Sequence, residues 1–291
     1  MNKEELLASG GLDFTVSKCK MNYTNAGSNA LHNTTFFCTV NDKTNEALSP
    51  VGSKYTIKQN KELLDSIIDR LNPDTYDLSQ SKCGMFGGGK KVFFFIKLTN
   101  VIDIPFASDS MDLYLYALSS HDGSQRLTYG ISTRMHSCSN MFATLMADVD
   151  NNHVLKHTKQ ISSDVTQKLN GLIKRNADGL LRLFTIMADH TYSDDFKSKF
   201  MDIVAKTDIK GVRRSTIDRR EKLTQSIWVE TESKGNNYYG LFNGLTHYLT
   251  HEYETNHSSD YEMLTGSSQA FTKKAFNMII KELVDKGICL N

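Results

Sequence analysis

The chain of 291 residues is long enough for one large domain or two modest ones, each with its own hydrophobic core. Hydrophobic residues make up 39% of it and charged residues 23%, which excludes wholesale disorder. The formal net charge of +1 excludes the strongly basic composition of an indiscriminate duplex-binding protein, although it permits a local basic face.

Strand signals dominate the first half of the chain. Thr34–Val40 combines β-branched and aromatic residues and is followed by turn residues, which predicts a strand. Val92–Leu98 is apolar on both faces, as is typical of a central strand. Met111–Leu118 and Leu127–Thr133 predict two further strands, and the Asp-Gly pair at 122–123 predicts a hairpin between them.

Helical periodicity appears at Gln59–Leu71, which carries one apolar stripe and ends at an Asn-Pro pair. It returns beyond residue 139, where we expect helices at Asn140–Val149, Lys159–Arg175, Gly179–Phe200, Asp218–Val229, Tyr238–Tyr253 and Ser268–Lys286. The last of these should bury Ala270, Phe271, Phe276, Ile279, Ile280 and Leu283. The sequence therefore predicts the α+β class, with a mixed or antiparallel β-rich core domain at 1–155 and a largely helical region at 156–291 packed on it as one unit.

The expected location is a reducing compartment, the cytoplasm. The five cysteines are odd in number, widely spaced and without a CxxC pair, which favours free thiols. The N-terminal residues lack the apolar stretch of a signal peptide. No apolar run approaches the roughly 18 residues that a membrane-spanning helix needs, so we expect no membrane partner.

The segment from Gly84 to Lys90 satisfies the GxxxxGK spacing of a phosphate-binding loop. That mechanism also needs a Ser or Thr after the lysine and a helix whose amide groups converge on the phosphates. Here Lys91 follows and a strand begins, so a glycine-rich turn that leads into a hairpin is the better interpretation. Lys90 and Lys91 near its tip either contact a phosphate backbone or keep the turn soluble.

Two histidine pairs are spaced four residues apart, His153 with His157 and His247 with His251, so each would share one helix face. No HExxH motif occurs and nothing is spaced to complete a tetrahedral set, so we expect packing, capping or partner contacts and no metal. No GxSxG motif occurs either, and we expect no enzymatic activity and no cofactor. An enzyme would require at least three of the following to converge with carboxylates: His121, His136, His153, His157 and His251.

Charge is distributed unevenly in the second half. Ala205–Lys222 contains seven basic and three acidic residues, whereas Trp228–Glu262 contains one basic and six acidic residues. Such polarity builds a basic groove, head-to-tail contacts between identical subunits, or simply a solvated face. Arginine suits phosphate because its planar guanidinium bonds two oxygens at once.

Six stretches carry a family resemblance, in this order along the chain: Gly11–Lys18, Val51–Asn60, Gly84–Leu98, Ser119–Ser124, Arg134–Asn140 and Tyr239–His251. Together they resemble the phage- and plasmid-like proteins grouped as domain of unknown function 932, over nearly the whole chain. Tyr239–His251 is the most specific stretch, and an Arg–Cys–Asn signature corresponds to Arg134, Cys138 and Asn140. The resemblance implies a phage or mobile-element context but no agreed activity.

A looser resemblance concerns the order of elements between Gly84 and Val149. A hairpin, two strands and a helix in that order look like the core of Red-beta- and Erf-type single-strand annealing proteins. Those proteins bind single strands along a basic groove and assemble into rings or filaments, so the analogy implies nucleic acid and a homo-oligomer.

Our leading hypothesis is a phage or plasmid accessory protein of DNA metabolism that binds, and possibly anneals, single-stranded DNA in the host cytoplasm as a homo-oligomer. The residues expected to contact phosphates are Lys90, Lys91, Arg126, Arg134, Arg213 and Arg214. The alternative is a phage protein-binding module that acts on a host protein without nucleic acid.

Overall fold

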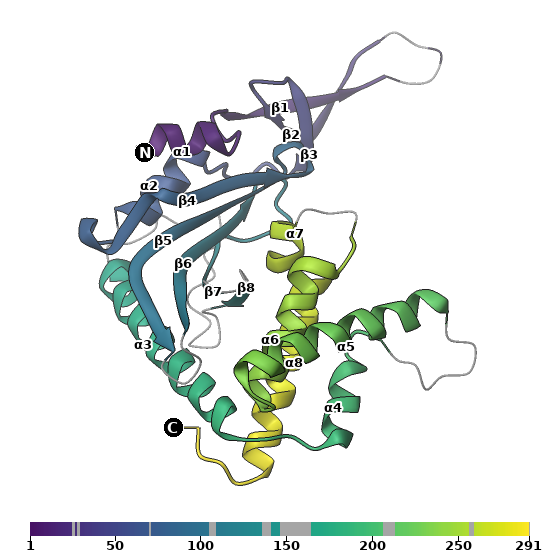
Figure 1. Cartoon of the computed structure of the whole chain (residues 1–291). Coiled ribbons are helices and arrows are strands. Elements are labelled where there is room, and N and C mark those ends of the chain that lie inside the picture. Colours follow the sequence, from purple (N-terminus) through teal and green to yellow (C-terminus); the bar gives the residue numbers. More distant parts are fainter. Residues whose placement is uncertain are drawn as a thin grey trace. The chain divides into compact units, whose positions relative to one another are not determined.

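The structure, a computed structural model, describes residues 1–24, 27, 30–69, 71–104, 109–135, 141–145, 164–205, 213–255 and 259–290 (Figure 1). The chain forms two compact units. The first comprises Met1–Asn100, Tyr114–Ile131 and Leu145–Lys174, and the second comprises Val101–Leu113, Ser132–Thr144 and Arg175–Asn291. The domain boundary predicted after residue 155 lies outside the described residues.

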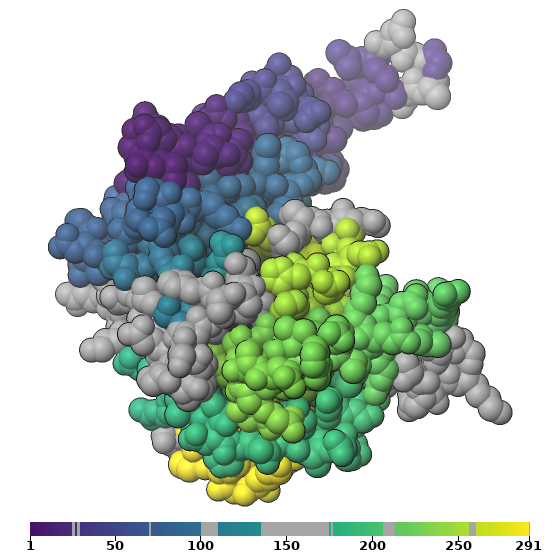
Figure 2. Space-filling model, in the orientation of Figure 1, coloured from purple at the N-terminus to yellow at the C-terminus, as the bar shows by residue number. Residues whose placement is uncertain are grey.

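The first sheet is an antiparallel meander of three strands, β1 (Val16–Tyr23), β2 (His32–Asn41) and β3 (Glu46–Val51). β2 contains the strand predicted at Thr34–Val40. Asn45 in the following turn has a positive φ of 57°, which asparagine tolerates better than most residues. The far end of the β1–β2 hairpin extends away from the rest of the first unit (Figures 1 and 2).

The second sheet has five strands, which are adjacent in chain order: β4 (Tyr76–Phe86), β5 (Lys91–Ile104), β6 (Asp109–Ser120), β7 (Thr128–Met135) and β8 (Met141–Leu145). All the residues from Val92 to Ile96 are buried, so the prediction of a central strand covered on both faces is confirmed. The strands predicted at Met111–Leu118 and Leu127–Thr133 are β6 and β7, joined by the predicted loop.

The helix predicted at Asn140–Val149 is wrong where the structure describes it, because residues Met141–Leu145 form strand β8. Its neighbour in the sheet is β7. The local sequence favours a helix, but pairing with a neighbouring strand satisfies the same backbone hydrogen-bonding groups and overrides that preference.

A glycine-rich turn joins β4 to β5, as predicted. Gly87, Gly88 and Gly89 have φ angles of 60°, 68° and 100°, a region that favours glycine, and Phe86 pairs with Lys91 across the hairpin. A strand and not a helix follows Lys90, so the amide groups of the turn do not converge as they do in a phosphate-binding loop.

Two short helices pack in the first unit. α1 (Lys3–Ser9) contacts β4 and α2 (Asn60–Ile68). α2 ends at Ile68, three residues earlier than predicted, and Pro73 begins a short 3-10 turn at Pro73–Thr75. The predicted apolar stripe is confirmed, since α2 buries Leu63, Leu64, Ile67 and Ile68.

The second half of the chain is helical, as predicted. Its elements are α3 (Asp164–Asp189), α4 (Asp194–Met201), α5 (Arg214–Lys234), α6 (Tyr238–His247), a π-helical turn η5 (Tyr248–Glu252), α7 (Ser259–Leu264) and α8 (Ser267–Asp285).

The predicted break between the helices Lys159–Arg175 and Gly179–Phe200 is misplaced. α3 continues through Gly179 as far as Asp189, and the chain breaks at residues 190–193 instead. Ser193 then starts α4, because its hydroxyl accepts a hydrogen bond from the Phe196 amide at 3.2 Å and two aspartates follow it in the first turn. A capping residue therefore marks this boundary better than the glycine does.

The buried face of α8 is rotated from the predicted one. Ile279 and Leu283 are fully buried as expected, but Ala270 is exposed. The observed face follows a helical spacing that includes two hydroxyl residues: Ser268, Thr272, Ala275, Ile279 and Leu283. Thr272 donates to the Ser268 carbonyl at 2.8 Å, so this polar group is satisfied inside the helix.

α5 and α6 pack directly on each other and frame the site described below. Leu223 and Ile227 on α5 are fully buried, and α6 is buried along Tyr238–Thr246. A side chain at Gly244 would place its Cβ only 2.4 Å from the Ile227 Cα, so only glycine permits this close approach.

Candidate functional site

The six basic residues predicted to contact phosphate lie in both units. In the first unit, Lys90 and Arg126 are exposed and Lys91 is half-buried at the start of β5. The His121 amide donates to the Lys90 carbonyl at 2.8 Å, so the glycine turn lies beside the loop that carries Arg126. The structure therefore brings these three basic residues to one end of the second sheet.

The first-unit group is not purely basic. Asp122 lies in the same loop. Burial by itself would raise the pKa of its carboxyl, but hydrogen bonds from Ser124 and the charge of Lys91 outweigh burial. The pKa of Asp122 therefore lies below its usual value. Asp122 is thus ionised at neutral pH, and part of the charge of Lys91 is neutralised by it.

In the second unit, Arg134 is exposed near the end of β7, while Arg213 and Arg214 are exposed at the start of α5. Two other cations of the same basic segment are already engaged. Arg220 binds the Asp202 carboxylate at 2.5 Å, and Lys222 binds Glu254 at 3.0 Å. Neither Arg213 nor Arg214 forms an ion pair with any residue that the structure describes.

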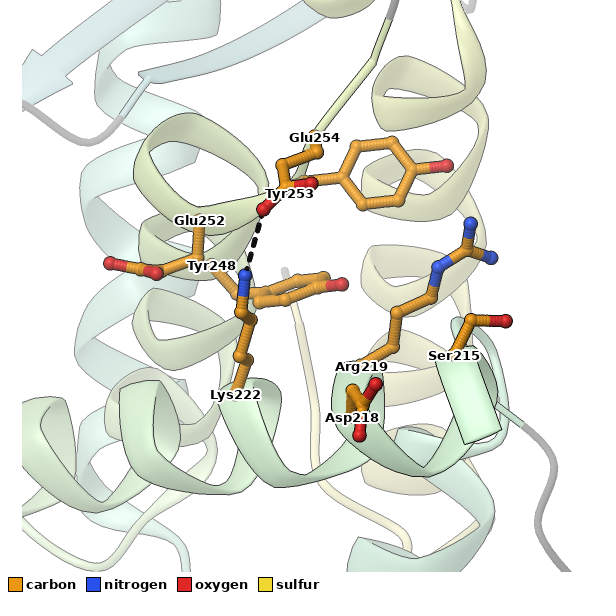
Figure 3. A pocket seen from close by; sticks show the side chains of 8 residues that line it. All are labelled: Ser215, Asp218, Arg219, Lys222, Tyr248, Glu252, Tyr253 and Glu254. Carbon is orange, nitrogen blue, oxygen red and sulfur yellow. Dashed lines mark hydrogen bonds and ion pairs between the residues drawn. The ribbon is translucent and has the colours of Figure 1, made fainter. Parts of the chain in front are cut away.

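A pocket of about 370 Å³ lies in the second unit, between the N-terminal half of α5 and the π-helical turn (Figure 3). Its lining comprises Ser215, Asp218, Arg219, Lys222, Tyr248, Glu252, Tyr253 and Glu254. Figure 3 shows Arg219 and Lys222 extending from α5 toward the rings of Tyr248 and Tyr253.

Local geometry explains why these side chains meet. Ser215 lies four positions before Arg219, and Arg219 lies three before Lys222, so these pocket residues share one face of α5. On the other side, the Tyr253 amide donates to the Tyr248 carbonyl at 2.8 Å, a bond across five residues that widens the helix by one residue. This π-type turn brings the two tyrosine rings to 5.8 Å between centroids, although they are five residues apart.

The pocket contains two aromatic rings and two cations. Lys222 is paired with a carboxylate, and Arg219 contacts an aromatic ring. The Arg219 guanidinium lies 5.8 Å from the centroid of the Tyr253 ring, a cation–π distance. The hydrogen bond and charge of Glu254 raise the pKa of Lys222, so that ammonium is held in its charged, paired form. Burial raises the pKa of Tyr248 to about 12 despite the nearby charge of Arg219, so its hydroxyl stays protonated at neutral pH.

A buried ionic cluster lies further along the same pair of helices. Glu230 on α5 accepts from Lys234 Nζ at 2.5 Å and lies 2.8 Å from His247 Nδ1. The rings of His247 and His251 are in edge contact, with centroids 5.0 Å apart. Among the described residues, no group of three or more His, Cys, Asp or Glu side chains is placed to hold a metal ion.

His121, the other described histidine considered for a site, lies in the first unit. It is buried there, and its Nε2 lies 2.8 Å from the Asn60 Oδ1. The other histidines considered for a catalytic site, His136, His153 and His157, lie outside the described residues. Cys138 and Asn140 of the family signature lie outside them too.

Sequence reasoning missed the pocket. It identified the basic segment that contains Arg219 and Lys222, but neither Tyr248 nor Tyr253 was distinguished from core aromatics. One signal pointed toward it, since the resemblance is most specific at Tyr239–His251, the segment that forms α6 and most of the π-helical turn.

The described parts of the chain define an α+β protein whose second unit holds a pocket lined by aromatic and charged side chains. The family model described as Domain of unknown function (DUF932) matches residues 47–270, and the chain belongs to this family. The match includes every residue of the pocket and all six predicted basic residues. No curated protein and no solved structure matches the chain. Within the described segments, no helix has both the length and the apolar character needed to cross a bilayer.

Proposed function

We propose that the protein binds single-stranded DNA, as an accessory of DNA recombination or replication in a phage or plasmid context. The observation that carries the proposal is the pair of adjacent, exposed arginines at the start of α5. Two neighbours in the same segment, Arg220 and Lys222, are tied to carboxylates, whereas Arg213 and Arg214 form no ion pair with the described residues. They are thus positioned for a negatively charged ligand.

The position of these arginines on the helix supports a ligand more than a structural role. Arg213 is the N-cap residue of α5 and Arg214 its first residue, and the first turn contains no acidic side chain. A cation at a helix N-terminus interacts unfavourably with the helix dipole, and each one lowers the stability of the helix by roughly 0.3–1 kcal/mol. The same end offers unpaired amide groups that bind phosphate, and two guanidiniums strengthen that preference.

In the first unit, Lys90, Lys91 and Arg126 supply a second basic surface in this proposal, and Arg134 adds a contact in the second unit. Assembly into a homo-oligomer in the host cytoplasm would multiply the contacts that each unit makes with a strand. Asp122 limits the first-unit surface, because it neutralises part of the charge of Lys91.

Fluorescence anisotropy with a labelled oligonucleotide, titrated at several salt concentrations, tests this proposal. Affinity should fall steeply with salt. Replacing both Arg213 and Arg214 by Ala should reduce the slope of log K against log salt concentration by about 1.4, at roughly 0.7 per phosphate contact on a single strand. The double variant Lys273→Ala/Lys274→Ala is the matched control, because both lysines are exposed on α8 in the same unit. Absent or salt-insensitive binding, or an equal effect of the control, refutes the proposal.

A protein-binding module that acts on a host factor is the second candidate. It is favoured by large apolar side chains on the outside of α5, where Ile217 is 45% and Trp228 55% exposed. They are eleven residues apart, about three helical turns, so they lie on the same side of the helix. A stoichiometric host protein that survives nuclease treatment in a pull-down, and is lost with Trp228→Ser, would favour this function over DNA binding.

A further inference from the structure

We infer that the pocket between α5 and the π-helical turn receives one unstacked nucleobase of the bound strand. This inference rests on the proposed function and adds a base-binding site to its phosphate contacts. The pocket belongs entirely to the second unit and has a volume of about 370 Å³, room for one flat heterocycle.

The walls of the pocket suit a flat aromatic ring. Tyr253 is half-buried and makes an edge-to-face contact with Phe271, with 5.9 Å between the ring centroids. This contact restricts the orientation of the Tyr253 ring. Tyr248 also lines the pocket but is only 1% exposed, so Tyr253 supplies the ring face that a base can reach. A ring held in this way is pre-organised for stacking, because little side-chain entropy is lost when a base binds.

The charges in the pocket disfavour a phosphate and accommodate a neutral base. Three carboxylates line it, against the two cations Arg219 and Lys222. Lys222 is neutralised by Glu254 at 3.0 Å, and Arg219 lies against the Tyr253 ring rather than against an acid in the described residues. A planar guanidinium beside an aromatic ring can stack on a base and donate to its ring nitrogens and carbonyl oxygens.

The distance along α5 links the pocket to the phosphate contacts. Arg214 precedes Arg219 by five residues, which is about 8 Å along the helix axis. One strand can therefore place a phosphate at the start of α5 and turn a neighbouring base toward Tyr253. The carboxylates at the pocket rim keep the backbone outside.

The test compares an oligonucleotide with and without abasic sites for binding to the unchanged 291-residue chain and to three variants. With the unchanged protein, removing bases should weaken binding about tenfold, equivalent to 1.4 kcal/mol at 25 °C and within the range for stacking of one base. Tyr253→Ala should bind both oligonucleotides alike, whereas Tyr253→Phe, which keeps the ring, should behave as the unchanged protein. Arg219→Ala alters the other wall without touching the π-helical turn and should also reduce the difference.

The outcomes separate the two levels of the proposal. If no oligonucleotide binds, the proposed function and the base pocket both fail. If strands bind with salt dependence but abasic sites and Tyr253→Ala change nothing, only the base pocket is refuted. A free deoxynucleoside presents the same ring, and it should bind much more weakly than the strand because it lacks the phosphates; equal affinity would overturn the assignment of the pocket to a strand.

Discussion

Removing the charge of Glu230 should destabilise the helical unit strongly. The Glu230 side chain is 3% exposed and that of Lys234 is 7% exposed, and the carboxylate contacts both the Lys234 ammonium and the His247 ring. Glu230→Gln keeps the shape of the side chain but removes the carboxylate charge that pairs with the buried Lys234 ammonium. Breaking a buried ion pair from one side costs roughly 3–5 kcal/mol.

We expect the lower end of that range, about 3 kcal/mol, because the glutamine amide oxygen still accepts one hydrogen bond. Urea unfolding, followed by the fluorescence of Trp228, measures this loss of unfolding free energy. Trp228 is the only tryptophan in the chain and lies on the same helix as Glu230. The matched control is Glu232→Gln, since Glu232 is exposed two residues away and its change should cost less than about 0.5 kcal/mol.

A second variant tests the cause rather than the size of the effect. Glu230→Gln/Lys234→Met removes both charges, and it should recover most of the lost stability because an apolar replacement of a buried ion pair is often neutral. Equal unfolding free energies for Glu230→Gln and Glu232→Gln, or a double variant no more stable than Glu230→Gln, would refute the claim that losing the Glu230 charge beside the Lys234 ammonium causes the destabilisation.

Three further predictions concern packing and reactivity. Gly244→Ala should destabilise the protein by roughly 1–3 kcal/mol, because the new Cβ would lie 2.4 Å from the Ile227 Cα; an unchanged melting temperature would show that α5 and α6 separate easily. Tyr116→Phe should leave stability unchanged or raise it, since this buried hydroxyl has no hydrogen-bond partner among the described residues, and a loss above about 1 kcal/mol in denaturant unfolding would contradict this. Burial raises the pKa of Cys83 to about 12, so in the native protein at neutral pH a thiol reagent should modify exposed Cys19 quickly and Cys83 hardly at all; peptide mapping of the labelled protein distinguishes the two.

Some elements follow from local signals alone. The apolar residues Val92–Ile96 indicated a buried strand, and the glycine turn before them indicated a hairpin, because both depend on a few adjacent residues. β8 and the break before α4 did not follow, since strand pairing with β7 and the cap at Ser193 outweighed helical periodicity and a glycine.

By itself, the sequence determined the α+β class, the strands β2, β5, β6 and β7, the helical character of the second half and the unequal distribution of charge there. The sequence also identified six basic residues as candidate phosphate contacts, and their binding to DNA stays a prediction. Only the tertiary structure decided which cations are already paired, because the partners of Arg220 and Lys222 are 18 and 32 residues away. The pocket likewise depends on a π-type turn and on the close packing of α5 on α6, and long-range packing of this kind leaves no short sequence pattern.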